Sequence, residues 1–119
     1  MKANSQRKKR SIKEIEPLLA EIKKTIQKLY TDRLVDVFLY GSFARNNATQ
    51  DSDIDIAVVL KARVNQSKEI DRTCDALYDF MLKSGELISV FPVSESEMKD
   101  SVWPLYRHIK SEGKRLTRG

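Results

Sequence analysis

The chain has little cysteine and little histidine, and each shortage argues against a class of chemistry. Cys74 is the only cysteine among 119 residues, so no disulfide can form within the chain. Its place in a helical pattern, with no histidine nearby, favours a small buried side chain over a nucleophile. His108 is also alone, which argues against a histidine metal cluster or a histidine-assisted catalytic triad.

Long hydrophobic runs are absent as well. No stretch approaches the roughly 20 apolar residues that span a bilayer, and the basic N-terminal residues are not followed by the apolar segment of a secretory signal. We therefore expect a cytoplasmic protein with no membrane association. Apolar residues make up 40% of the chain and charged residues 33%, which is typical of one globular domain of this length.

Positive charge is in excess and gathers at the two ends of the chain. The net charge is +5, with clusters of Lys and Arg within residues 2–10 and 110–118. We interpret both clusters as solvated tails, which are favoured over a nucleic-acid contact because neither interleaves aromatic residues for base stacking. The expected organisation is a flexible basic arm over 1–11, a single domain over 12–116 and a tail over 117–119.

Apolar periodicity predicts a mixture of helices and strands. The expected helices cover residues 17–30, 65–83, a short segment after Ser94, and 104–113; the expected strands cover 34–40, 53–60 and 87–93. Pro17 is placed as the first helical residue. Ser94 and Glu97 have the spacing of a capping box, and Gly85 of a helix stop. Trp103 and Tyr106 are expected to pack against the core, with an exposed partner-binding patch as the alternative.

The most specific pattern lies between the first two predicted strands. Gly41 and Ser42 end one strand, and after ten intervening residues Asp53 and Asp55 open the next. Residues two apart on a strand project to the same face, so the two carboxylates lie side by side. Such a pair is stable mainly beside a cation, and magnesium takes one or two carboxylates together with phosphate oxygens.

The Gly-Ser turn suits the phosphates of the same ligand. A glycine lets the backbone approach a phosphate without a Cβ clash, and the Ser42 hydroxyl with nearby backbone N–H groups can bind phosphate oxygens. Arg45 would add positive charge near a triphosphate. Each half of the pattern alone is common, but together they indicate a nucleotide site. The chain has neither the Gly-Lys-Ser/Thr of a Walker loop nor a Rossmann fingerprint.

The run Leu39–Arg45 followed by Ser52–Ile56 resembles the minimal nucleotidyltransferases of the DNA polymerase β superfamily. Their signature is Gly-Ser, ten residues and then Asp-x-Asp, and the similarity extends over nearly all of residues 12–116. It implies an α+β fold in which a small mixed β-sheet is flanked by helices. It also implies ATP with Mg²⁺, and transfer of AMP to an acceptor.

Motif by motif, the resemblance assigns Gly41 and Ser42 to nucleotide binding, and Asp53 and Asp55 to the metal and to catalysis. Many members of this family are paired with an all-helical HEPN protein. They act as antitoxins, sometimes by adenylylating a tyrosine of the HEPN toxin. A HEPN-type partner is therefore the expected acceptor.

The chain departs from the family pattern at two places. Asn46 stands where the family often has glycine, a mild change because asparagine tolerates left-handed backbone. The third carboxylate expected on a later strand is missing from Leu87–Phe91; Glu86 just precedes that strand and is the candidate, although it shares a face with core residues. Loss of a positioned base costs about 10²–10⁴ in rate. The alternative hypothesis is therefore a catalytically weak or inactive nucleotide-binding antitoxin that acts by steric binding.

Overall fold

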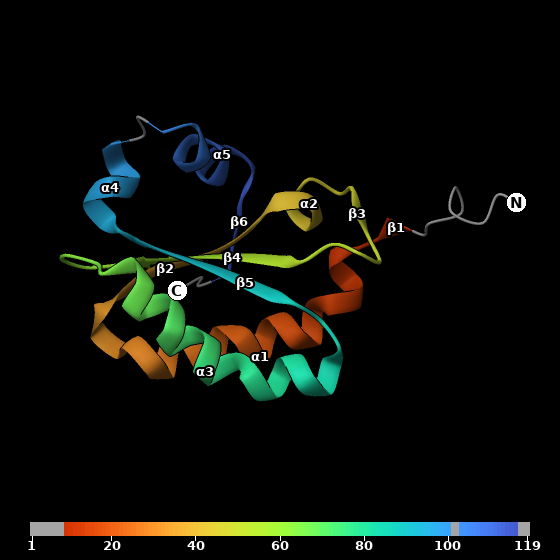
Figure 1. Cartoon of the computed structure of the whole chain (residues 1–119). Helices are drawn as coiled ribbons and strands as arrows, with labels where there is room; N and C mark the ends of the chain where they lie inside the picture. Colours follow the sequence, from red (N-terminus) through yellow and green to blue (C-terminus); the bar gives the residue numbers. More distant parts are fainter. Residues whose placement is uncertain (1–8, 101–102, 117–119) are drawn as a thin grey trace, which may run out of the picture.

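A mixed β-sheet separates two groups of helices in this computed structural model, which describes residues 9–100 and 103–116 (Figure 1). The helices are α1 (Ile12–Tyr30), α2 (Gly41–Ala44), α3 (Gln66–Ser84), α4 (Glu95–Asp100) and α5 (Pro104–Glu112), with a 3₁₀ turn, η2, at Thr31–Arg33. The strands are β1 (Lys9–Arg10), β2 (Leu34–Tyr40), β3 (Ala48–Thr49), β4 (Ile54–Leu60), β5 (Ile88–Ser94) and β6 (Lys114–Arg115). The expected α+β class, with helices around a small mixed sheet, is confirmed.

Strand β4 is the centre of the sheet, whose order is β5-β4-β2-β6. It pairs antiparallel with β2 and parallel with β5, and β6 closes the far edge by pairing antiparallel with β2. Helix α3 makes the crossover that a parallel β4–β5 pair requires. Because both faces of β4 are covered, every residue from Ile56 to Leu60 is buried.

The sheet has a hydrophobic core on each face. Helices α1 and α3 cover one face, and α4 and α5 lie over the other (Figure 1). The first core includes Ile22, Ile26, Leu39, Ile54, Ile56 and Leu77. The second includes Phe38, Ala57, Val59, Met98 and Ile109. Strand alternation therefore directs Asp53 and Asp55 toward the α5 side, while Ile54 and Ile56 fill the core under α1.

Helix α1 begins at Ile12, so the expected start at Pro17 is wrong. A proline inside a helix leaves the carbonyl four residues earlier without its N–H partner. Both Pro17 and Lys13 are exposed, so water can satisfy that carbonyl. Burial of Ile15 against the sheet is then enough to extend the helix by more than a turn.

Short strands were missed by the sequence analysis. Lys9 and Arg10 pair antiparallel with Thr49 and Ala48, so the end of the expected basic arm and part of the segment between the first two predicted strands form β1 and β3. Two-residue strands carry no readable periodicity. Residues 1–8 of the expected arm and the expected tail, 117–119, lie outside the described residues.

Two of the helix-end signals are confirmed. Ser94 Oγ accepts a hydrogen bond of 3.1 Å from the Glu97 N–H, and Glu97 Oε1 accepts one of 3.2 Å from the Ser94 N–H. This reciprocal pair starts α4. Gly85 ends α3 with a left-handed φ of 74°, as a glycine stop requires.

Two side chains expected in the core are instead exposed. Cys74 is exposed because α3 buries the row of Glu69, Thr73 and Leu77, which lies on a different face of the helix. Trp103, just before α5, is 64% exposed, whereas Tyr106 packs beside Phe91 with ring centroids 6.0 Å apart. Within the described residues, no helix is long and apolar enough to cross a membrane.

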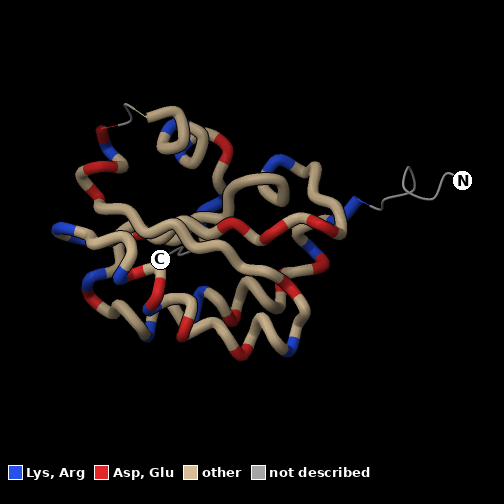
Figure 2. The backbone as a smooth tube through the Cα atoms, viewed as in Figure 1, with Lys and Arg blue, Asp and Glu red and all other residues tan. Residues whose placement is uncertain are grey.

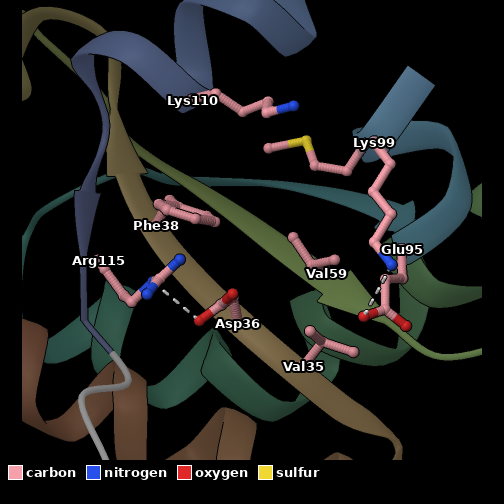
Figure 3. A pocket seen from close by; sticks show the side chains of 9 residues that line it. Val35, Asp36, Phe38, Val59, Glu95, Lys99, Lys110 and Arg115 are labelled. Carbon is pink, nitrogen blue, oxygen red and sulfur yellow. Dashed lines mark ion pairs between the residues drawn. The ribbon is translucent and has the colours of Figure 1, made fainter. Parts of the chain in front are cut away.

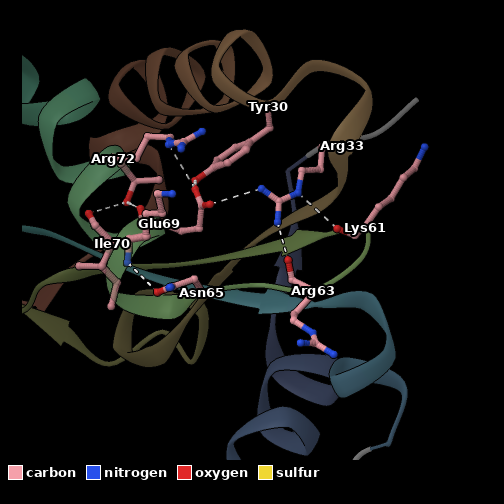
Figure 4. Close-up of polar contacts among 10 residues, drawn as sticks. Tyr30, Arg33, Lys61, Arg63, Asn65, Glu69, Ile70 and Arg72 are labelled. Atoms are coloured by element: carbon pink, nitrogen blue, oxygen red, sulfur yellow. Dashed lines mark hydrogen bonds and ion pairs between the residues drawn. The ribbon is translucent and has the colours of Figure 1, made fainter.

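Most charged residues belong to the helices and loops (Figure 2), and one of them, Glu69 on α3, is buried. This carboxylate is 4% exposed and accepts hydrogen bonds from Tyr30 Oη at 2.7 Å and Arg33 Nη1 at 3.3 Å (Figure 4). Arg72 Nε lies 3.5 Å away. Burial raises the pKa of Glu69, but the hydrogen bonds and the two arginines outweigh it and lower the pKa overall. The network joins the end of α1 to α3.

We expect Glu69→Ala to lower the free energy of unfolding by about 2 kcal/mol at neutral pH, because charged hydrogen bonds are lost. The folded pKa is lowered, so this stabilisation is complete above the unfolded value of about 4.3 and disappears as pH falls through the folded value. Urea denaturation at neutral pH and at about pH 3.5 measures both effects. Asp75→Ala, an exposed change on α3, should stay within about 0.5 kcal/mol; a Glu69→Ala effect independent of pH would contradict the assignment.

Candidate nucleotide-binding site

The end of β2 meets the start of β4 at a contact that only glycine permits. Tyr40, the last residue of β2, pairs with Asp55. Gly41 follows with φ of 76°, and a Cβ built on it would lie 2.2 Å from Asp55 Oδ2. Both the left-handed backbone and the lack of space require a residue without a side chain. The Asp55 carboxylate therefore lies directly against the backbone of the Gly-Ser turn.

The turn itself is compact and hydrogen-bonded. Helix α2 is a single short turn, and the Arg45 N–H donates to the Gly41 carbonyl at 3.0 Å. The Asn47 N–H donates to the Ser42 carbonyl at 2.9 Å. Asn46 has φ of 63°, the left-handed conformation that asparagine tolerates where the family often has glycine. Helix α2 thus places Gly41 and Ser42 in its own first turn.

Electrostatics tie the aspartates and Arg45 into one group. Burial raises the pKa of Asp55, the charge of Asp53 raises it further, and Arg45 lowers it. Tyr40 has its pKa raised to about 12 by burial and by the charge of Asp55. Acidic residues gather at the start of β4, beneath α2 (Figure 2). A partly buried carboxylate beside a second one is the environment that a cation stabilises.

A pocket of about 320 Å³ opens beside this group. Its lining comprises Tyr40, Gly41, Ser42, Arg45, Asp55, Leu105, His108 and Glu112. The structure thus brings four of the six sequence-predicted site residues into one cavity. The last three lining residues come from α5, and the sequence analysis missed them. Their i, i+3 and i+7 spacing on one face of a helix was readable, but nothing in the sequence indicated what that face would contact.

Glu86 is not brought to the aspartate pair. The sheet register places Ser89 beside Asp55, and the Leu87 carbonyl accepts from the Ile54 N–H at 2.9 Å. Glu86 instead receives two hydrogen bonds from Arg10, of 2.9 and 2.5 Å. Arg10 in turn lies over the Phe43 ring, 5.3 Å from its centroid. Among the described residues, no group of three or more histidine, cysteine or acidic side chains is arranged to hold a metal.

The donor set nevertheless fits one magnesium ion bound with a nucleotide. Asp53 and Asp55 supply hard oxygen ligands, and Mg²⁺ commonly completes its shell with waters and phosphate oxygens. The pocket of about 320 Å³ beside Gly41 and Ser42 leaves room for phosphates next to Asp55. For a second metal, the described residues offer no group of three acidic, histidine or cysteine side chains placed to bind it.

Another pocket on the same face of the sheet has a different character (Figure 3). It is about 200 Å³ in volume, with Phe38, Val59 and Met98 among its lining residues. Its carboxylates belong to ion pairs, Asp36 with Arg115 at 3.1 Å and Glu95 with Lys99 at 3.9 Å. None of the motif residues lines it, so the Gly41–Asp55 pocket is the better candidate.

Together, the mixed sheet, the Gly-Ser turn and the carboxylate pair define the nucleotidyltransferase class. The family model of the nucleotidyltransferase domain matches residues 19–115. The chain therefore belongs to the nucleotidyltransferase-domain family.

Two relatives from Methanocaldococcus jannaschii have names proposing that they are protein adenylyltransferases. One is 28% identical over 102 residues, covering 85% of this chain and 96% of the relative. The other is 33% identical over 76 residues, covering 64% of this chain and 76% of the relative. The similarity to the first thus spans almost its full length.

Solved structures show the same fold at low sequence identity. A mutant of the toxin–antitoxin pair MntA–HpeT contains a chain that is 20% identical, with a TM-score of 0.56 over 84% of this chain and 72% of that one. A Sulfolobus solfataricus protein proposed to be a nucleotidyltransferase is 21% identical, with a TM-score of 0.56 over 90% of this chain and 86% of its own.

Gly41→Ala should disrupt the site, because its Cβ would overlap the Asp55 carboxylate. We expect a loss of about 2 kcal/mol or more in unfolding free energy and loss of nucleotide binding. Gly85→Ala is the matched control, since Gly85 has nearly the same φ with no atom within 4 Å of the added Cβ. It should lose only about 1 kcal/mol and keep binding. Equal behaviour of the two variants in urea denaturation would refute the close contact.

Asp55→Asn should stabilise the metal-free protein at neutral pH. Burial and Asp53 raise the folded pKa of Asp55 above its unfolded value, so the ionised carboxylate disfavours folding. The gain should vanish as pH falls through that raised pKa, where the wild-type carboxyl is also neutral. Thermal unfolding across this range measures it, with the exposed change Asp75→Asn as control. A lower melting midpoint for Asp55→Asn at neutral pH would be the contrary result.

Proposed function

We propose that this protein is a Mg²⁺-dependent adenylyltransferase that moves AMP from ATP to a HEPN-type toxin, and so acts as an antitoxin in the cytoplasm. The observation that carries the proposal is the contact of Gly41 with Asp55, which puts the Gly-Ser turn and a carboxylate suited to a metal beside one pocket. Membership of the nucleotidyltransferase-domain family supports the reaction class.

Different residues of the site would bind the metal and orient the phosphates. Asp53 and Asp55 would hold Mg²⁺, which when bound neutralises phosphate charge and polarises the reacting phosphate. Ser42 and the backbone of its turn would orient the phosphates, with Arg45 adding a cation. The acceptor oxygen forms a bond to the α-phosphorus, the bond from that phosphorus to the bridging oxygen breaks, and pyrophosphate leaves. The acceptor proton passes to water, since Glu86 is held by Arg10.

Several features favour a protein acceptor. Leu87 is 62% exposed. Its carbonyl accepts a hydrogen bond from the N–H of Ile54, which lies between the two aspartates. Trp103 and Leu105 are exposed at the start of α5, and Leu105 lines the pocket. Exposed apolar residues around a polar site suit a protein surface. The names of the Methanocaldococcus jannaschii relatives and the toxin–antitoxin structures support the same choice.

A second candidate is an antitoxin that binds its partner sterically and turns over slowly or not at all. The observation that favours it is that, among the described residues, no third carboxylate joins Asp53 and Asp55 in a group able to hold a metal, together with the Arg10–Glu86 pairing. Metal and nucleotide could still bind at Asp53 and Asp55, so the two candidates differ in AMP transfer rather than in ATP binding.

The double variant Asp53→Asn with Asp55→Asn should lose Mg²⁺-dependent ATP binding while remaining folded, because the metal ligands are removed and the packing is kept. Calorimetry with and without Mg²⁺ measures binding, and circular dichroism checks the fold. Asp71→Asn with Asp75→Asn removes two exposed carboxylates from α3 and is the matched control. Unchanged ATP affinity in the Asp53/Asp55 variant would refute the site.

Incubation with a purified HEPN-type protein and ATP labelled on the α-phosphate separates the two candidates. Metal-dependent label on that protein, lost in the Asp53/Asp55 variant, supports the enzyme. Neutralisation of the toxin by that same variant, with no label transferred by the wild type, would favour the steric candidate.

A further inference from the structure

Helix α5 supplies a second wall to the nucleotide pocket. Leu105, His108 and Glu112 are spaced three and four residues apart, so they share one face of the helix, and all three line the pocket with Ser42 and Asp55. The signature motif contains none of them. His108, the only histidine of the chain, therefore lies in the site.

The Glu112 carboxylate contacts two side chains that can donate protons, those of Arg45 and His108. Glu112 Oε1 lies 3.8 Å from Arg45 Nη1, and Glu112 Oε2 lies 3.5 Å from His108 Nδ1. Arg45 also acts on Asp55, whose pKa its charge lowers. Asp55, Arg45, Glu112 and His108 thus form a chain of groups across the pocket.

These contacts are weak enough to be replaced. The side chains of Glu112, Arg45 and His108 are all more than a third exposed. The distances from Glu112 to Arg45 and to His108 are also long for charged hydrogen bonds. Exposed ion pairs contribute only about 0–1 kcal/mol. A more highly charged anion in the pocket would compete well for the same two groups.

We propose that Arg45 and His108 form a clamp for the pyrophosphate part of ATP, and that Glu112 holds both side chains in the pocket until the phosphates replace it. The inference rests on the proposed function. A guanidinium matches phosphate oxygens in a bidentate geometry, and an imidazole N–H can donate to a third oxygen. In the proposed reaction Asp53 and Asp55 act, through the metal, on the α-phosphate. Arg45 and His108, which lie after α2 and on α5, would instead bind the pyrophosphate that leaves.

The clamp requires residues from two elements far apart in the sequence. Arg45 follows α2, whereas His108 and Glu112 lie on α5. A purely structural role for Glu112, joining α5 to α2, makes the opposite prediction. It would make Glu112 variants less stable without any gain in nucleotide affinity.

The test is calorimetry of Mg²⁺·ATP and of AMP on the full chain. His108→Ala should weaken ATP binding about tenfold, the size of one charged hydrogen bond, and leave AMP binding unchanged. Arg107→Ala removes an exposed cation from the same helix outside the pocket lining, and should change ATP binding less than about twofold. His108→Gln, which keeps an N–H donor, should recover part of the affinity.

Glu112→Gln gives the sharper result, because it should tighten ATP binding about threefold by releasing both partners. That gain should shrink when His108→Ala is added. Equal ATP affinities of the His108→Ala and Arg107→Ala variants would overturn the clamp. So would a Glu112→Gln variant that binds no more tightly, or a His108→Ala variant that loses AMP binding equally. Failure of the proposed function is distinct: the wild type would then not bind Mg²⁺·ATP at all.

Discussion

The close approach of Gly41 to Asp55 is the constraint on which the site depends. A side chain at residue 41 would occupy the position of the Asp55 carboxylate, 2.2 Å from its oxygen. The contact joins the end of β2 to the start of β4, the two strands that pair at the centre of the sheet. Because β4 is buried on both faces, neither strand can shift to relieve a clash. The Gly-Ser turn and the Asp55 carboxylate are therefore positioned by the core.

The same rigid placement is unfavourable for the carboxylates themselves. Burial and the nearby Asp53 raise the pKa of Asp55, with Arg45 as a partial compensation. Packing alone would favour a neutral side chain at this position. The network around Glu69 shows the opposite case, since hydrogen bonds and two arginines there more than offset burial. The difference marks Asp55 as a group suited to a cation, and Glu69 as a structural residue that joins α1 to α3.

Much of the fold could be predicted from apolar periodicity, and the errors have identifiable causes. The long helices and the three long strands were predicted to within a few residues, except that α1 starts earlier because Pro17 lies on its exposed face. Cys74 and Trp103 were placed in the core, yet the rotation of α3 and the start of α5 leave both exposed. Periodicity identifies a face, but only packing selects which neighbouring row is buried.

The sequence by itself determined the composition of the candidate site's first wall. Gly41, Ser42, Asp53 and Asp55 lie within 15 residues, and strand geometry alone puts the two carboxylates on one face. Only the tertiary structure decided the rest. The β4–β5 register places Ser89 beside Asp55, and Glu86 is hydrogen-bonded to Arg10 instead. The packing of α5 places His108 and Glu112 in the same pocket as Arg45. The Arg10–Glu86 and Arg45–Glu112 contacts each join residues more than 60 positions apart. The Ser89–Asp55 pair joins two strands that share no motif. They are set by how layers pack on a common core, which no local pattern encodes.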